Sequence, residues 1–184
     1  MPKTMKKTPR MTLTDYRTTG IRLLVSLFTL TFCETLLQAE QSHPASTVEG
    51  DATGWTVRCT TGNGGLHCEA TQEIRLKTTQ QLLVATVVSL ASDNKQPTML
   101  IKLPHGLFLP DGVSINLGTR SPQQLRIQTC DAAGCYAGMP ISADMLSALQ
   151  SEQEMTVSFE DLERRRITVR VMLVGFGAAY QKIK

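Results

Sequence analysis

Short segments in which apolar and polar residues alternate recur from about residue 55 to the end of the chain. Such alternation is typical of a β-strand with one buried face, because successive side chains of a strand point to opposite sides. Glycine, proline, asparagine and aspartate separate these segments, which indicates turns. The predicted strands are 55–59, 66–76, 82–90, 98–103, 113–117, 125–130, 155–159 and 166–176.

Three segments add detail to this pattern. Residues 82–90 are apolar almost throughout, so we expect a strand that is covered on both faces. The triplet Leu-Phe-Leu at 107–109 lies between two turns, and we expect a short strand in the core. The alternative is an exposed apolar loop that docks on a partner or a membrane. The segments that flank the charged residues 160–166 predict a hairpin.

Two helices are expected among the strands. Ser142 can cap a helix near 142–150, whose apolar residues fall on one face, and residues 178–183 predict a short C-terminal helix. Together these elements predict a single all-β domain at 54–184, with an antiparallel β-sandwich or barrel-like fold. Its length of about 130 residues is common for one domain.

The first 39 residues have the pattern of a secretory signal peptide. A region rich in lysine and arginine precedes an apolar run at 21–32, which is shorter than the roughly 20 residues that a membrane-spanning helix needs. We expect cleavage after Ala39 and a flexible, polar N-terminal segment at 40–53. Two alternatives stay open: a lipoprotein signal in which Cys33 is acylated, and an uncleaved N-terminal anchor.

The charge of the chain divides at the same point. The whole chain contains 19 Lys and Arg against 16 Asp and Glu, a net charge of +3. Six of these basic and two of these acidic residues lie in 1–39, so the remainder carries 13 basic and 14 acidic residues, a net charge of −1. A nearly neutral domain has no general attraction for a polyanion, so we expect no nucleic acid as a partner.

Four cysteines follow the leader, namely Cys59, Cys68, Cys130 and Cys135. An even number in an exported domain indicates disulfides. Of the three possible pairings we expect Cys59 with Cys68 and Cys130 with Cys135, because each pair encloses turn residues. A zinc site is disfavoured because zinc knuckles usually have two to four residues between ligands, and the spacers here are eight and four. A redox role would need a C-x-x-C motif, which the sequence lacks.

The sequence contains no recognisable catalytic constellation. His43, His67 and His105 are far apart and follow no metal pattern, and no nucleophile motif is present. We expect His67 to face solvent and Trp55 to lie in the core. The chain is therefore predicted not to be an enzyme, with no metal and no cofactor. The alternative is an envelope enzyme or enzyme modulator whose site is assembled from distant residues.

The segment 160–166 contains three acids and the arginines Arg164, Arg165 and Arg166. One interpretation is a basic patch for heparin-like or lipid-phosphate ligands. The other is a solvated turn whose charges neutralise one another and prevent edge-to-edge pairing of strands. The acids next to the arginines favour the second interpretation.

Several motifs together resemble the invasion-associated locus B (IalB) protein family of alphaproteobacteria. They are W-T-V-R-C at 55–59, the cysteine at 68, L-P-H-G-L-F-L-P-D-G-V at 103–113, C-D-A-A-G-C-Y-A at 130–137 and G-F-G-A-A at 175–179. The resemblance covers nearly all of the chain from Trp55 to about Lys182. It implies export to the periplasm, the outer membrane or the cell surface, with no catalytic residue and no cofactor.

The resemblance also bears on partners. Founding members of the family in blood-borne pathogens are linked to entry into host red cells, whereas similar proteins occur in free-living relatives. We therefore expect an exported, non-enzymatic envelope protein that binds another protein or envelope component, or a host-surface component. A peripheral position at the outer membrane is a further expectation.

Overall fold

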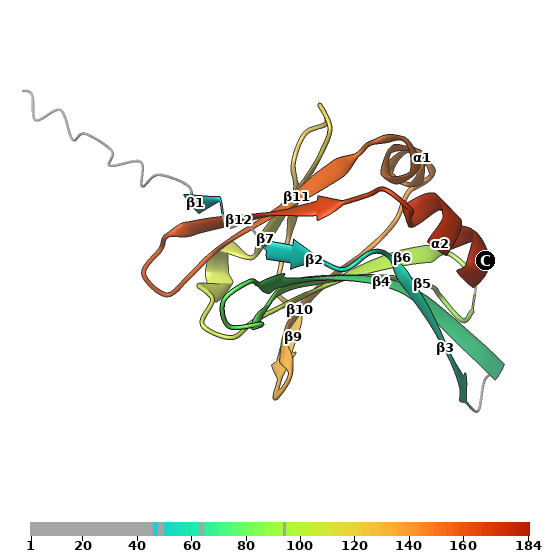
Figure 1. Ribbon diagram of the computed structural model, residues 1–184, viewed down its shortest axis with the longest axis horizontal. Coiled ribbons are helices and arrows are strands. Elements are labelled where there is room, and N and C mark those ends of the chain that lie inside the picture. The colour runs from blue at the N-terminus through green and yellow to red at the C-terminus, as the bar shows by residue number, and fades with distance from the viewer. Residues whose placement is uncertain (1–45, 48–49, 63–64, 94) are drawn as a thin grey trace, which may run out of the picture. The chain divides into compact units, whose positions relative to one another are not determined.

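The computed structural model describes residues 46–47, 50–62, 65–93 and 95–184, which form two β-sheets and two helices (Figure 1). Sheet A contains, in spatial order, β1 (Ser46–Thr47), β12 (Arg166–Met172), β11 (Glu154–Glu160), β7 (Val113–Leu117) and β8 (Gln123–Leu125). Sheet B contains β2 (Gly50–Ala52), β4 (Gly65–Leu76), β5 (Leu82–Leu90), β6 (Pro97–Leu103), β10 (Gly134–Pro140) and β9 (Thr129–Asp131), and β3 (Thr56–Gly62) also pairs with β4. Neighbouring strands are antiparallel except β1 and β12, which confirms the predicted all-β fold.

Alternate residues of the strands build a single apolar core between the sheets. In sheet B, Ala70 is opposite Val88, which is opposite Met99 on the next strand, and all three are at most 1% exposed. In sheet A, Val157 is opposite Ile115 and Val169, which are equally buried. Because every second side chain of a strand points to the same side, one face of each sheet lies in the core. The strand β5 is buried on both faces along its centre, as its apolar sequence predicts.

One buried row of sheet B is not apolar. Gln72 and Thr86 lie directly opposite each other on β4 and β5 and are 2% and 0% exposed. Gln72 Oε1 and Thr86 Oγ1 have no hydrogen-bond partner among the described residues. These two side chains are the polar part of an otherwise apolar inner face.

Three predictions about strands were wrong. The segment 125–130 alternates, but the chain leaves sheet A after β8 and joins sheet B at β9, so it divides between two strands. The predicted strand 166–176 ends at Met172, because the chain turns at Gly175, which has a φ of 89°. At 107–109, Leu107 makes one bridge to Asp161 and is buried, whereas the following residues turn into a short 3-10 helix (Leu109–Asp111).

Two short strands lie within 40–53, the segment that the sequence predicts to be a flexible lead-in. The strand β1 pairs with the edge of sheet A, and β2 pairs with β4 at the edge of sheet B. Both use backbone hydrogen bonds to an exposed edge, which needs no apolar pattern in the added segment. The predicted leader at 1–39 and its alternatives at Cys33 lie outside the described residues.

Two helices cover one end of the sandwich. The helix α1 (Ala143–Ser151) begins at Ser142, whose Oγ accepts a hydrogen bond from the Met145 amide at 3.2 Å, as predicted. The helix α2 (Phe176–Ile183) starts two residues earlier than predicted and buries Phe176 completely. Trp55 is half-buried rather than fully enclosed; its Nε1 donates to the Met172 carbonyl at 3.0 Å, and its ring contacts that of Phe176.

Candidate functional site

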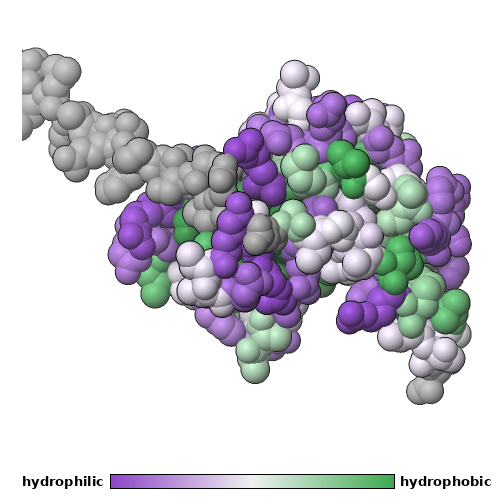
Figure 2. Space-filling view, viewed as in Figure 1, coloured by the Kyte–Doolittle hydropathy of each residue, from purple (hydrophilic) through white to green (hydrophobic). Residues whose placement is uncertain are grey.

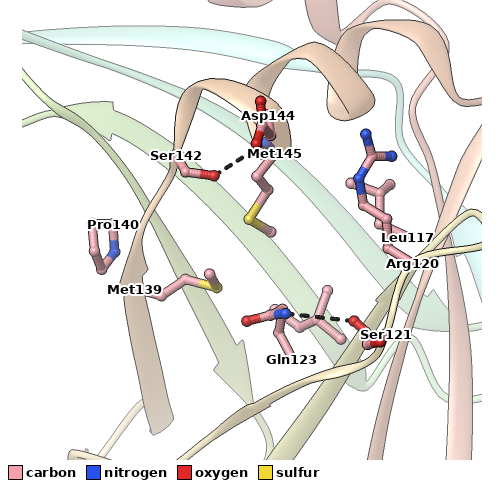
Figure 3. Close-up of a pocket in the computed structure, with 10 residues that line it drawn as sticks. Leu117, Arg120, Ser121, Gln123, Met139, Pro140, Ser142, Asp144 and Met145 are labelled. Atoms are coloured by element: carbon pink, nitrogen blue, oxygen red, sulfur yellow. Dashed lines mark hydrogen bonds between the residues drawn. The ribbon is translucent and has the colours of Figure 1, made fainter.

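A groove of about 440 Å³ opens between α1, the end of β10 and the loop that joins β7 to β8 (Figure 3). We call it the methionine groove. Its floor is apolar, and the thioether ends of Met139 and Met145 point into the same space from β10 and α1. The polar side chains that line it are those of Arg120, Ser121, Gln123, Ser142 and Asp144.

Local structure explains why these side chains meet. Met139 is on the inner face of β10, where the sandwich ends, and Met145 is in the first turn of α1, fixed by the Ser142 cap. Arg120 follows a turn that begins at Gly118, which has a φ of 61°, and the Arg120 amide donates to the Leu117 carbonyl. The groove is thus formed by two strand ends, one capped helix and one tight turn.

The chemistry of the methionine groove fits binding. Arg120 and Asp144 are exposed and form no ion pair within the described part of the chain, so a guanidinium and a carboxylate are both available to a partner. Methionine side chains are flexible and adapt to apolar groups of varied shape. An apolar floor with a few polar groups at the rim is the usual composition of a binding site.

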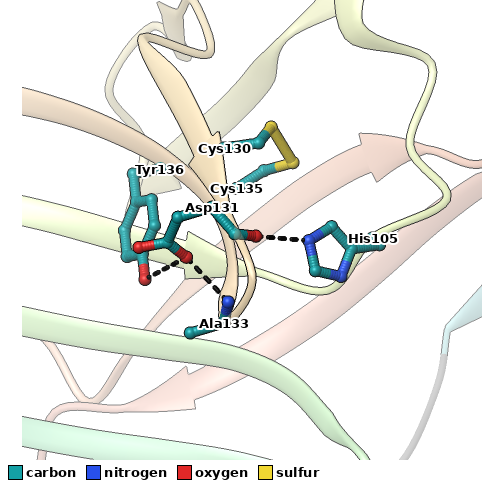
Figure 4. Close-up of a disulfide and its surroundings, with 6 residues drawn as sticks. All are labelled: His105, Cys130, Asp131, Ala133, Cys135 and Tyr136. Carbon is teal, nitrogen blue, oxygen red and sulfur yellow. Dashed lines mark hydrogen bonds between the residues drawn. A yellow bond between two sulfur atoms is a disulfide. The ribbon is translucent and has the colours of Figure 1, made fainter.

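The cysteines Cys130 and Cys135 form a disulfide across β9 and β10, where they are direct partners with Cα atoms 4.0 Å apart (Figure 4). Asp131 is the last residue of β9, and its Oδ1 accepts hydrogen bonds from the Ala133 amide at 2.7 Å and the Tyr136 hydroxyl at 3.1 Å. The His105 ring Nε2 lies 2.7 Å from the Asp131 carbonyl oxygen. Side-chain and backbone contacts therefore reinforce the covalent link at this turn.

Two pKa values reflect these contacts. The hydrogen bond from the Ala133 amide, helped by the Tyr136 hydroxyl, lowers the pKa of Asp131 below its ordinary value, although desolvation acts in the opposite direction. Desolvation and the neighbouring Asp131 raise the pKa of Tyr136. The Asp131 carboxylate stabilises the β9–β10 hairpin, because both hydrogen-bond donors, the Ala133 amide and the Tyr136 hydroxyl, belong to that hairpin.

The second pair of cysteines, on β3 and β4, is arranged in the same way. Cys59 and Cys68 are direct partners on β3 and β4, again with Cα atoms 4.0 Å apart and a disulfide between them. Both pairings are those that the sequence predicts. Each links a hairpin across its two strands, at an antiparallel position where opposed side chains are close.

The arginines at 164–166 are matched by acids in the turn between β11 and β12. Arg164 contacts Glu160 at 2.9 Å and Asp111 at 3.3 Å. The remaining ion pairs are Arg165 with Asp161 at 2.7 Å and Glu163 at 3.2 Å, and Arg166 with Glu160 at 3.8 Å. Each arginine thus has an acidic partner, as expected for a solvated turn with neutralised charges.

One further contact fixes this turn, and the interactions within the turn shift two pKa values. The Arg164 guanidinium lies 3.9 Å from the centre of the Phe108 ring, a cation–π arrangement. Desolvation raises the pKa of Asp161, but hydrogen bonds from Arg165 and Glu163 outweigh it, so the net pKa is lowered. Hydrogen bonding and charge from Asp161 raise the pKa of Arg165.

The histidines are not brought into a site by the described structure. His67 is exposed on β4, as predicted, and His105 contacts the cysteine-linked turn; His43 lies outside the described residues. No group of three or more histidine, cysteine, aspartate or glutamate side chains that could hold a metal occurs in the described ranges. Neither α1 nor α2 has the length and apolar character needed to span a bilayer.

The sequence did not reveal the methionine groove. Arg120 lies in a loop, Gln123 and Met139 lie on two different strands and Asp144 lies in a helix, and none forms a motif with the others. The visible signals were the Ser142 cap and the glycine and proline that flank Arg120. Such signals place each element in the chain but do not show which elements meet in space.

Comparison with known proteins bears on the family and the fold of this chain. The family model for the invasion associated locus B (IalB) protein matches residues 55–184. Invasion protein B homologues from two strains of Brucella abortus are each 29% identical over 174 residues, covering 92% of this chain and 96% of the homologue. The crystal structure of invasion associated protein B from Bartonella henselae matches with a TM-score of 0.62 at 17% identity, covering 70% of this chain and 89% of that one. The resemblance expected from the motifs is confirmed: this chain belongs to the IalB family.

Proposed function

We propose that this chain is an exported, non-enzymatic protein of the bacterial envelope that binds a protein of the envelope or of a host surface through the methionine groove. The observation that carries the proposal is the groove itself, with two adaptable methionines and with a guanidinium and a carboxylate that form no ion pair to another described residue. The names of the relatives connect the family with invasion, which makes a host-surface protein one of the two partner classes.

The positions of the perturbed titratable groups support binding over catalysis. Catalytic groups with shifted pKa values usually cluster in a cleft. Here Asp131, Tyr136, Asp161 and Arg165 have shifted pKa values, and none of the four lines the methionine groove. They lie in the two hairpin turns described above, where their partners are structural.

Site-specific photo-cross-linking in the bacterium that naturally produces this protein tests the binding role. A photo-cross-linking amino acid at Gln123, on the rim of the groove, is expected to capture one envelope or host-surface protein. Arg170, exposed on the outer face of sheet A, is the matched control position and should give no adduct. Arg120→Glu should abolish the adduct at position 123. Equal adducts from both positions, or an adduct that Arg120→Glu leaves unchanged, would contradict the proposal.

Export is tested separately. The cysteine pairs support an oxidising compartment, and the leader pattern supports a mature N-terminus at Glu40. Cell fractionation and N-terminal sequencing of the protein from its native host should place it outside the cytoplasm and begin the sequence at Glu40. A lipid-modified Cys33 as the first residue would replace the signal-peptide assignment with the lipoprotein alternative.

A further inference from the structure

A second hollow, of about 580 Å³, lies between the β3–β4 hairpin, the β5–β6 loop and α2. We call it the lysine hollow. Its apolar lining includes Leu66, Leu90, Tyr180 and Ile183, and its basic rim consists of Lys95, Lys182 and Lys184. Figure 2 shows hydrophobic and strongly hydrophilic side chains next to one another at the right-hand end, where Figure 1 places α2 and this hairpin.

The charges of the lysine hollow are not balanced by protein groups. No aspartate or glutamate side chain lines it, and none of its three lysines forms an ion pair within the described ranges. The arginines at 164–166 differ, because each has an acidic partner. Of these two basic clusters, the lysines are the one with charge available to an external anion.

An exposed leucine accompanies these lysines. Leu66 is 69% exposed, although Cys68, two residues further along the same side of β4, is partly buried. The Cys59–Cys68 disulfide crosses the hairpin just beside it. A covalently linked hairpin presents this leucine without the loss of conformational entropy that ordering a flexible loop at the interface would cost.

We propose that the lysine hollow docks on an anionic lipid bilayer, with Leu66 entering the interface and the three lysines contacting headgroup phosphates. An apolar residue next to a lysine cluster is the usual arrangement in proteins that bind such surfaces peripherally. Lysine ammonium groups are compact charges without the planar fork by which arginine recognises one particular anion, which favours a surface of many phosphates. The inference deepens the proposed envelope function by naming a membrane contact that is separate from the methionine groove.

Vesicle co-sedimentation of the chain purified from its native host tests this inference. The chain should bind vesicles of phosphatidylcholine with about 30% phosphatidylglycerol and should not bind pure phosphatidylcholine. Because one lysine near an anionic surface contributes about fivefold to binding, Lys95→Gln, Lys182→Gln and Lys184→Gln together should weaken it by roughly 100-fold. Leu66→Ser should weaken it by about tenfold.

The triple change Arg164→Gln, Arg165→Gln and Arg166→Gln is the matched control, since it removes the same formal charge from the paired cluster. It should alter vesicle binding by less than about twofold. An equal loss in both triple variants would show a mere net-charge effect and overturn the docking site. Saturable binding of inorganic phosphate would overturn it in favour of a small-anion site. Because these vesicles contain no protein, the result does not depend on the partner of the methionine groove.

Discussion

The buried polar pair in sheet B provides a direct test of the core. Thr86 is fully buried, its Oγ1 has no hydrogen-bond partner among the described residues, and it lies opposite Gln72, whose Oε1 is equally unpaired. Thr86→Val replaces the hydroxyl with a methyl group and keeps the branched shape, which suits the centre of a strand. The change therefore removes a polar group with little alteration of volume.

The expected effect is a gain in stability. Burying a hydroxyl without a hydrogen bond costs about 1–3 kcal/mol by mutational measurements. Since some of this cost is relieved by small movements of the side chain, we expect the free energy of unfolding to rise by about 1 kcal/mol. For a domain of about 130 residues this corresponds to roughly 4 °C in Tm.

Urea unfolding followed by circular dichroism measures this change, with an unchanged m-value as evidence that the unfolding reaction is the same. Thr98→Val on β6 is the matched control, because the Thr98 hydroxyl hydrogen-bonds to the Ser89 carbonyl and is 3.3 Å from the Ser89 hydroxyl. It should lose about 1 kcal/mol. A loss of 1 kcal/mol or more in Thr86→Val would refute the reasoning, since it would mean that the Thr86 hydroxyl has a favourable partner.

A double-mutant cycle adds the second residue. Gln72→Leu should also stabilise the protein, and the two effects should add if each polar atom is unpaired independently. A coupling energy above about 0.5 kcal/mol would instead indicate that the two side chains share an interaction. The cycle thus separates two isolated polar atoms from one connected network.

The remaining predictions concern the hairpins, pH and one glycine. Replacing Cys130 and Cys135 together by alanine should lower the free energy of unfolding by about 2 kcal/mol, because the disulfide closes a loop of about six residues; the reduced wild type, measured by urea unfolding in dithiothreitol, should be destabilised at least as much. The pKa of Asp131 is lower in the folded protein than the ordinary 3.8, so its contribution to stability is present above pH 4 and is lost as the pH falls through the folded pKa; a urea series from pH 6 to pH 2 should therefore decline less steeply for Asp131→Asn. Gly112→Ala should cost at least about 2 kcal/mol, because Gly112 has a φ of 66° and an added Cβ would clash with the Leu125 carbonyl oxygen. Gly54→Ala, where an added Cβ meets nothing within 4 Å, should stay within about 0.5 kcal/mol of the wild type; urea unfolding of both glycine variants measures the difference.

Strands and helices were predicted best where one pattern of apolar residues continued through the whole element and the element stayed in one sheet or one helix. The segment 82–90 and the helix after Ser142 are examples, because burial period and capping are local properties. The segment 125–130 shows the limit: Leu125 and Ile127 alternate with polar residues, yet the chain leaves sheet A after Leu125 and joins sheet B only at Thr129. Alternation reports which side of the chain is buried and does not report which strand lies alongside it.

The candidate binding surfaces were harder to predict for a related reason. The lysines of the lysine hollow come from a loop at 95 and from the C-terminal end of α2 at 182 and 184, and Leu66 comes from a hairpin. In the sequence each is an ordinary polar or apolar residue, whereas the arginines at 164–166 form a conspicuous run. The neighbouring acids in the sequence already predict that this run is neutralised, and the ion pairs confirm it. Only the folded arrangement shows that the scattered lysines meet at one hollow without an ion pair to any described residue.

The local pairing of the cysteines has a consequence for how the chain acquires its bonds during oxidative folding. Cys59 and Cys68 are 9 positions apart, and Cys130 and Cys135 are 5 apart. Among these four cysteines, the shortest wrong pairing, Cys68 with Cys130, closes a loop roughly seven times longer than the Cys59–Cys68 loop and costs about 1.7 kcal/mol more in chain entropy. Proximity alone therefore favours the correct pairs. We expect such a chain to depend little on a disulfide isomerase, and each hairpin to be joined before the core condenses around it.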